Sequence, residues 1–82
     1  MPKYMDHHDQ MPQMPPEAIQ GLADSVRAGH VNEHGVRVIN VIMGTDGSAD
    51  CLSEAPSADA VIAAHAAMGV EAGTVREVMT LV

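Results

Sequence analysis

The side chains in this chain that can bind a metal ion gather in a few short stretches. Asp6 directly precedes the adjacent pair His7 and His8, which are two of the five histidines. Further along the chain come Cys51, with carboxylates close to it, and then His65. Imidazole and carboxylate ligands together suit Zn, Cu, Fe and Ni, whereas carboxylates alone suit Mg or Ca. These residue types therefore indicate a site for a divalent transition metal, provided that the fold brings them together.

The first of these stretches is expected to be a β-strand over residues 3–8. Alternation along a strand then places Asp6 and His8 on one face and His7 on the other. A proline-rich loop follows, and apolar residues at three- and four-residue spacing predict a helix over residues 16–33, because proline suits the first helical position. Gly35 stands where a helix C-terminal cap is expected.

The middle of the chain predicts a hairpin. Residues 36–43 are rich in β-branched side chains and apolar on both faces, which indicates a strand covered on both sides. Asp46-Gly47 is a strong turn signal and leads into a further strand over residues 49–54. The two-sided strand favours assembly, because a chain of 82 residues cannot easily cover both faces of its own sheet.

A second helix and a last strand complete the chain. Ser57 is a good N-cap, and Gly69 is expected to end the helix. A strand is expected over residues 75–81. The helix carries one stripe that should face the sheet, made of Val61, Ile62, His65 and Met68.

The resulting order, βαββαβ, predicts a single α+β domain over residues 1–82 with the ferredoxin-like arrangement, an antiparallel sheet with both helices on one face. The other face would stay bare, with apolar groups contributed by residues 36–43 and 78–82. An exposed apolar sheet face marks an interaction surface. We therefore expect a homodimer in which two sheets pack face to face as a dimeric α/β barrel.

This fold brings the metal-binding side chains close together, at the same height along the strands of the sheet. The end of the first strand lies beside the start of the third, near Cys51, and the second helix runs back along that strand to His65. Two histidines with Asp6 or Glu54 would make a site whose remaining positions are open to water or to ligands from a second subunit. The alternative is ordinary structure: a histidine in a helical stripe is often a hydrogen-bonded core residue, and adjacent histidines at a strand end are often surface.

Charge and composition exclude several other functions. The net charge of −7 repels nucleic acid and anionic lipid, and Tyr4 is the one aromatic residue among Phe, Trp and Tyr. No stretch approaches the ~20 apolar residues of a membrane span, and the first residues contain no apolar region of the kind that acts as a signal peptide, so we expect neither membrane insertion nor secretion by that route. A single cysteine suits a reducing compartment, so we expect a cytoplasmic protein. Nucleotide-binding and serine-hydrolase motifs are missing.

Three stretches also carry a family resemblance: residues 4–8, residues 33–37, and residues 51–61 together with His65. They resemble a bacterial family of small domains of unknown function that includes nickel-binding proteins with a dimeric ferredoxin-like fold. The resemblance implies Ni²⁺, or a similar ion such as Zn²⁺ or Cu²⁺, bound by Asp6, His8, Glu54 and His65. One position departs from the pattern, because Asp24 stands where relatives have a histidine.

Three hypotheses follow from the sequence. The leading one is a metal-binding protein for storage, buffering or sensing. The second is a small dimeric α/β-barrel enzyme of the monooxygenase or isomerase type, with a pocket between sheet and helices and His8 or His65 as general base. The third is a plain interaction module. A metal ion bound tightly and in a fixed ratio to the protein would support the first hypothesis, and an organic ligand in the pocket would support the second.

Overall fold

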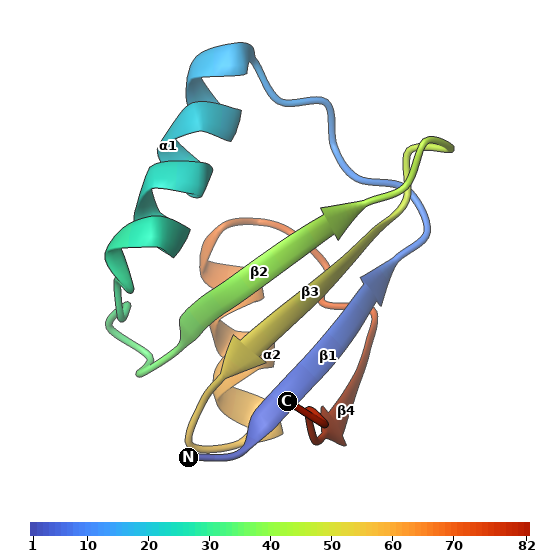
Figure 1. Ribbon diagram of the computed structural model, residues 1–82. Coiled ribbons are helices and arrows are strands. Elements are labelled where there is room, and N and C mark those ends of the chain that lie inside the picture. Colours follow the sequence, from blue (N-terminus) through green and yellow to red (C-terminus); the bar gives the residue numbers. More distant parts are fainter.

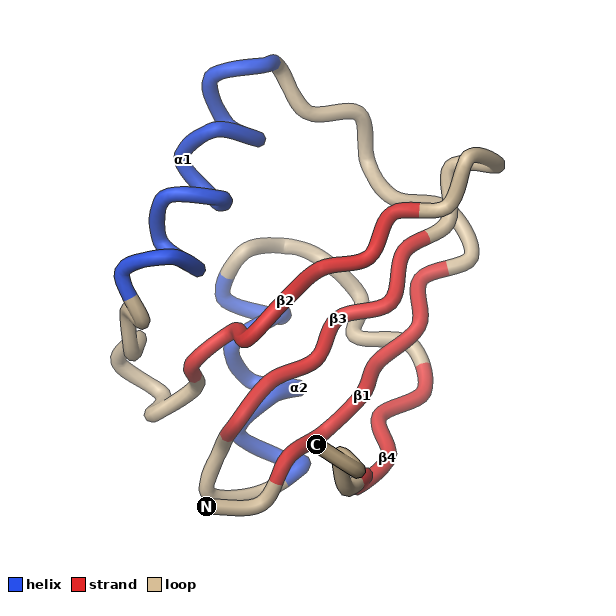
Figure 2. Tube along the Cα trace, in the orientation of Figure 1, coloured by secondary structure: helices blue, strands red, loops and turns tan.

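The computed structural model describes residues 1–82 and has the predicted βαββαβ order (Figure 1). Its four strands form one antiparallel sheet in the order β2-β3-β1-β4, which is the ferredoxin-like arrangement. Figure 2 shows α2 behind the sheet and α1 beside its β2 edge. The elements are β1 (Lys3–His8), α1 (Pro16–Ala28), β2 (Arg37–Met43), β3 (Ala49–Glu54), α2 (Ala58–Ala67) and β4 (Thr74–Val78).

Two boundaries differ from the sequence prediction. Helix α1 ends at Ala28, because Gly29 adopts a left-handed conformation with φ of 68°. The amides of Gly29 and His30 then donate to the carbonyls of Val26 and Ser25, both at 3.1 Å, which is the Schellman arrangement. The expectation that the helix would extend to residue 33 is therefore wrong. Strand β4 is also shorter than expected and stops at Val78.

Strand β2 contains a bulge that changes which side chains face the helices. The register against β3 shifts between Val38 and Asn40, so that Ile39 is an extra residue. Ile39 lines a groove together with residues of α1, and Val38 and Val41 face the same side as the buried residues of β3. The prediction that β2 is apolar on both faces is thus corrected. The face away from the helices receives Arg37, Asn40 and Ile42 from β2.

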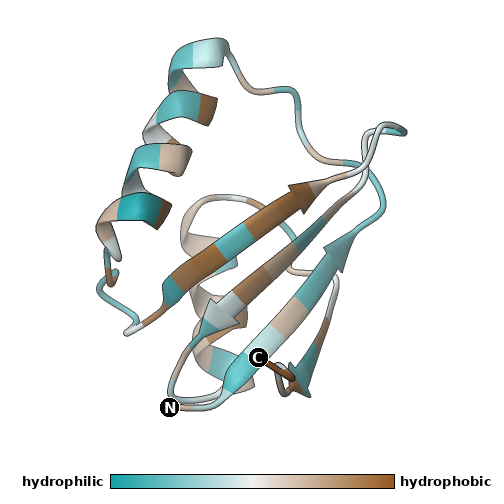
Figure 3. Cartoon of the chain, in the orientation of Figure 1, coloured by the Kyte–Doolittle hydropathy of each residue, from teal (hydrophilic) through white to brown (hydrophobic).

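The uncovered sheet face mixes apolar and charged side chains. Strand β2 is mostly hydrophobic in Figure 3, with a hydrophilic interruption. An ion pair between Arg37 and Glu54, at 3.6 Å, lies on this face. The apolar side chains placed there by the register are Met5, Ile42, Leu52 and Val78.

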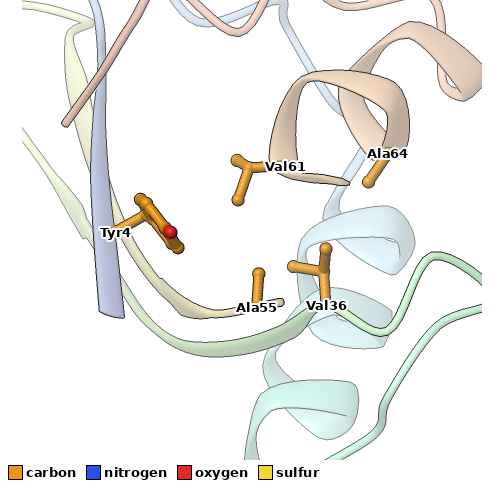
Figure 4. Close-up of a cluster of buried hydrophobic side chains, with 5 residues drawn as sticks. All are labelled: Tyr4, Val36, Ala55, Val61 and Ala64. Carbon is orange, nitrogen blue, oxygen red and sulfur yellow. The ribbon is translucent and has the colours of Figure 1, made fainter. Parts of the chain in front are cut away.

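The hydrophobic core is small and lies between the sheet and α2. Ser57 caps α2 as predicted, its hydroxyl oxygen accepting a hydrogen bond from the amide of Ala60 at 3.2 Å. Helix α1 has no fully buried residue. No helix is both long and apolar enough to cross a membrane. The buried cluster shown in Figure 4 consists of Tyr4, Val36, Ala55, Val61 and Ala64.

Candidate metal centre

A buried carboxylate lies at the centre of the candidate site. Asp6 occupies the middle of β1, on the face that α2 covers, and none of its surface is exposed. Its Oδ2 atom lies 2.6 Å from Nε2 of His8 and 3.1 Å from Nε2 of His65. Neither contact has hydrogen-bond geometry, so both carboxylate oxygens are buried without a hydrogen-bond donor. Such an unsatisfied buried group is costly unless another partner compensates it.

His65 is held in an orientation that directs its free nitrogen toward Asp6. Its Nδ1 atom donates a hydrogen bond to the Val61 carbonyl, one helical turn earlier, at 2.8 Å. Because Nδ1 carries that proton, the Nε2 lone pair of the neutral ring faces the carboxylate. Metal-binding histidines are commonly oriented in this way by a backbone carbonyl. The rings of His8 and His65 are stacked, with centroids 5.3 Å apart.

A proton and a metal ion would compete for Nε2 of His65. The polar contact with Asp6 raises the pKa of His65 above its usual 6.5, and the bond to Val61 adds to this effect while burial opposes it. The contact is close enough to favour the imidazolium although its angle is poor for a hydrogen bond. A protonated His65 paired with Asp6 is the purely structural alternative for this cluster.

Cys51 adds a thiol to the carboxylate and imidazole groups that could bind a metal ion at this site. It lies directly opposite Asp6 in the antiparallel pairing of β1 and β3. Ligand atoms of Asp6, His8 and Cys51 all lie within 4.8 Å of one another. Burial, helped by the charges of Asp6 and Asp50, raises the pKa of the Cys51 thiol to about 12. The thiol is therefore protonated at neutral pH, and a metal ion would have to displace its proton to bind sulfur.

The donor set fits a divalent transition metal. It combines two imidazole nitrogens, a carboxylate with unsatisfied oxygens, and a thiol within reach. Nitrogen and sulfur donors favour Ni, Zn or Cu over Mg and Ca. An ion in this cluster would also compensate the buried Asp6 carboxylate, whose oxygens accept no hydrogen bond.

The structure brings together three of the four residues that the sequence singled out. Asp6, His8 and His65 converge, whereas Glu54 lies at the far end of β3, opposite Lys3 and beside Arg37 on the uncovered sheet face. The sequence placed Cys51 at the same end of the sheet, although it is not one of the four residues singled out as ligands. The antiparallel pairing of β1 with β3 places Cys51 opposite Asp6, and this pairing could have been predicted from the order of the strands.

Asp24, the position at which the resemblance in the sequence implies a histidine, belongs to a surface network on α1. Its Oδ1 atom accepts a hydrogen bond from the Gln20 amide at 3.0 Å and lies 3.7 Å from the Arg27 guanidinium. The Asp24 side chain is 66% exposed. In this structure α1 therefore directs this carboxylate into solvent.

His7 belongs to a separate, exposed cluster, because strand alternation turns it away from His8. Its Nδ1 atom lies 2.8 Å from Oδ1 of Asp50, and its Nε2 atom lies 3.1 Å from Oδ1 of Asp9. The hydrogen bond with Asp50 is the main cause that raises the pKa of His7 above 6.5, although partial desolvation opposes it. The protonated ring is therefore the form that these contacts stabilise.

This cluster leads to a prediction about pH. Because the folded pKa of His7 is raised, its contribution to stability should be full below pH 6.5 and should be lost as pH rises through the folded value. We expect Asp50→Asn to lower the His7 pKa toward 6.5 in an NMR titration of the ring protons. Asp59→Asn, at an exposed position of α2, serves as the control and should leave the His7 titration unchanged. An unaltered His7 pKa in Asp50→Asn would contradict the assignment.

Comparison with known proteins gives a family for the chain. A family model described as "Nickel responsive protein SCO4226-like" matches residues 4–78. The crystal structure of SCO4226 from Streptomyces coelicolor A3(2) superposes with a TM-score of 0.72 at 26% sequence identity, covering 98% of this chain and 99% of that chain. No curated protein sequence matches significantly. The chain therefore belongs to the SCO4226-like family of nickel responsive proteins, as the resemblance in its sequence implied.

Proposed function

We propose that this protein binds a divalent transition metal ion, Ni²⁺ in the first place, through Asp6, His8 and His65, with Cys51 as a further donor. The observation that carries the proposal is the buried Asp6 carboxylate, which faces two histidine nitrogens and has no hydrogen-bond donor. Membership of a nickel responsive family supports nickel as the ion. The proposed role is storage, buffering or sensing, without catalysis.

The arrangement explains how a bound ion would also stabilise the fold. Asp6 and His8 belong to β1, Cys51 belongs to β3, and His65 belongs to α2. An ion held by these residues would link the sheet to the helix that covers it. The unfolded chain cannot present the same set, so the free energy of binding adds to the free energy of folding.

The proposal is tested by nickel binding at different pH values. Imidazole must be neutral to ligate, so calorimetric titration of tag-free protein with Ni²⁺ should give weaker binding at pH 5 than at pH 7. The raised pKa of His65 means that proton competition should begin above pH 6.5. Binding of equal strength across this range would argue for a carboxylate-only site.

The same titration can test whether Cys51 joins the site. If the thiol becomes a ligand, binding must release its proton, because the thiol is protonated in the free protein. Repeating the titration in two buffers with different ionisation enthalpies measures that release. We expect Cys51→Ser to release about one proton fewer per nickel ion than the wild type does. Equal proton release in the two proteins would remove Cys51 from the ligand set.

We further propose that the protein acts as a homodimer joined through the uncovered sheet face, as a dimeric α/β barrel. The buried side chains of β1 and β3 face α2 on the opposite side of the sheet, and the uncovered face carries Met5, Ile42, Leu52 and Val78. Light scattering should therefore give twice the chain mass of 8.6 kDa. A charge introduced at the centre of this face, Leu52→Asp, should produce the monomer, whereas a monomeric wild type would refute the proposal.

A further inference from the structure

An apolar cavity of about 310 Å³ lies between the sheet and the two helices. Nine of its thirteen lining residues are hydrophobic. They come from the loop before α1, from α1, from β2 and the residue before it, from β3, and from the residues that follow α2. Helix α1 lies beside the β2 edge of the sheet (Figure 1), has no fully buried residue and contributes Leu22 to the cavity wall. Folded proteins are normally packed to crystal-like density, so an empty space of this size forfeits many contacts.

We infer that this cavity is a binding site for a small, uncharged, mostly hydrocarbon molecule. Roughly half this volume, a cavity of about 150 Å³, is enough to hold benzene, so the space suits on the order of twelve non-hydrogen atoms. No Lys, Arg, Asp or Glu lines it, and the two histidines in the wall, His8 and His65, already direct Nε2 toward Asp6. A charged ligand would therefore lose its hydration without gaining a free partner. Water is a poor occupant too, because it needs several polar partners and the wall offers few.

The walls suit an apolar guest in shape as well as in polarity. Met11, Met14 and Met68 line the cavity, and the unbranched thioether chain adapts to irregular guests. Met68 keeps 69% of its surface exposed, so it lies at the rim. The polar side chains of the wall include His8 and His65, so a guest would lie directly against the proposed metal centre and shield it from water.

The inference can be tested by adding 1-octanol to the full-length protein. The protein is kept metal-free with a chelator, so that the result does not depend on whether the proposed metal site exists. The protein would carry ¹³C-methyl methionine. We expect saturable shifts of the methyl signals of Met11, Met14 and Met68, which line the cavity. Met5, on the uncovered face, and Met79, which is 92% exposed, provide internal controls and should not shift.

Two neighbouring substitutions provide a matched pair. Val41→Phe fills the cavity and should weaken octanol binding at least tenfold, whereas Ile42→Phe points to the other face and should leave binding unchanged. Should Val41→Phe fail to fold, Met68→Phe at the rim takes its place, because a largely exposed site tolerates the ring. Shifts that do not saturate, that extend equally to Met79, or that persist in a folded cavity-filled variant would overturn the inference, as would no shift at all.

Discussion

In thermal melts, replacing His65 with alanine should remove most of the stabilisation that nickel gives this protein. At a free Ni²⁺ concentration of 100 times the dissociation constant, the wild type should gain about 2.7 kcal/mol of unfolding free energy. For a chain of this size, that gain corresponds to a rise in Tm of roughly 10–20 °C. The His65 ring donates its Nε2 lone pair to the proposed site, so His65→Ala should show little of this rise.

The control is His30→Ala, which removes the same side chain from an exposed position beyond α1 and should keep the full nickel-dependent rise. His8→Ala and Asp6→Asn should behave like His65→Ala, because all three residues would then hold one ion. If His65 is only a core residue, His65→Ala should lose stability without metal while the nickel-dependent rise persists. An undiminished rise would remove His65 from the site.

Replacing Tyr4 with alanine should have the largest effect on the metal-free protein. Tyr4 is the single aromatic residue among Phe, Trp and Tyr, is 7% exposed, and belongs to the core cluster that joins β1 to α2. Truncating a buried aromatic side chain costs about 3–5 kcal/mol. Small domains have little stability to spare, so urea denaturation of Tyr4→Ala should show a greatly lowered midpoint or no folded baseline.

Met79→Ala is the control for this experiment, because Met79 is 92% exposed and its truncation should change stability by less than about 0.5 kcal/mol. Nickel should partly rescue Tyr4→Ala, since Tyr4 supports the strand that carries Asp6 and His8 but does not belong to the proposed ligand set. A loss for Tyr4→Ala as small as that for Met79→Ala would show that this cluster does not hold the fold together.

The convergence of Asp6, His8 and His65 was predictable because it depends on strong local patterns. Strand alternation puts Asp6 and His8 on one face, and the antiparallel pairing with β3 follows from the βαββαβ order. The same alternation separates Glu54 from the cluster, since Cys51 is buried and Glu54, three residues later, faces the other side. That separation was available from the sequence, although family resemblance kept Glu54 among the candidates.

Other features depend on packing that the sequence does not display. The bulge at Ile39 shifts the alternation of β2, and its apolar residues give no local sign of this shift. Gly29 and Gly35 are both suitable helix terminators, and only the hydrogen bonds of the folded chain select Gly29. The cavity depends on how the loop before α1 and the residues after α2 pack against the sheet, which no pattern of apolar residues specifies.

Anomalous diffraction at the nickel absorption edge, from crystals of tag-free protein grown with Ni²⁺, would locate the ion directly. We expect one peak in each chain within about 2.0–2.2 Å of a carboxylate oxygen of Asp6 and of Nε2 of His8 and His65, as is typical for such ligands. Peaks confined to surface histidines such as His7 and His30, with none beside Asp6, would contradict the proposed metal centre.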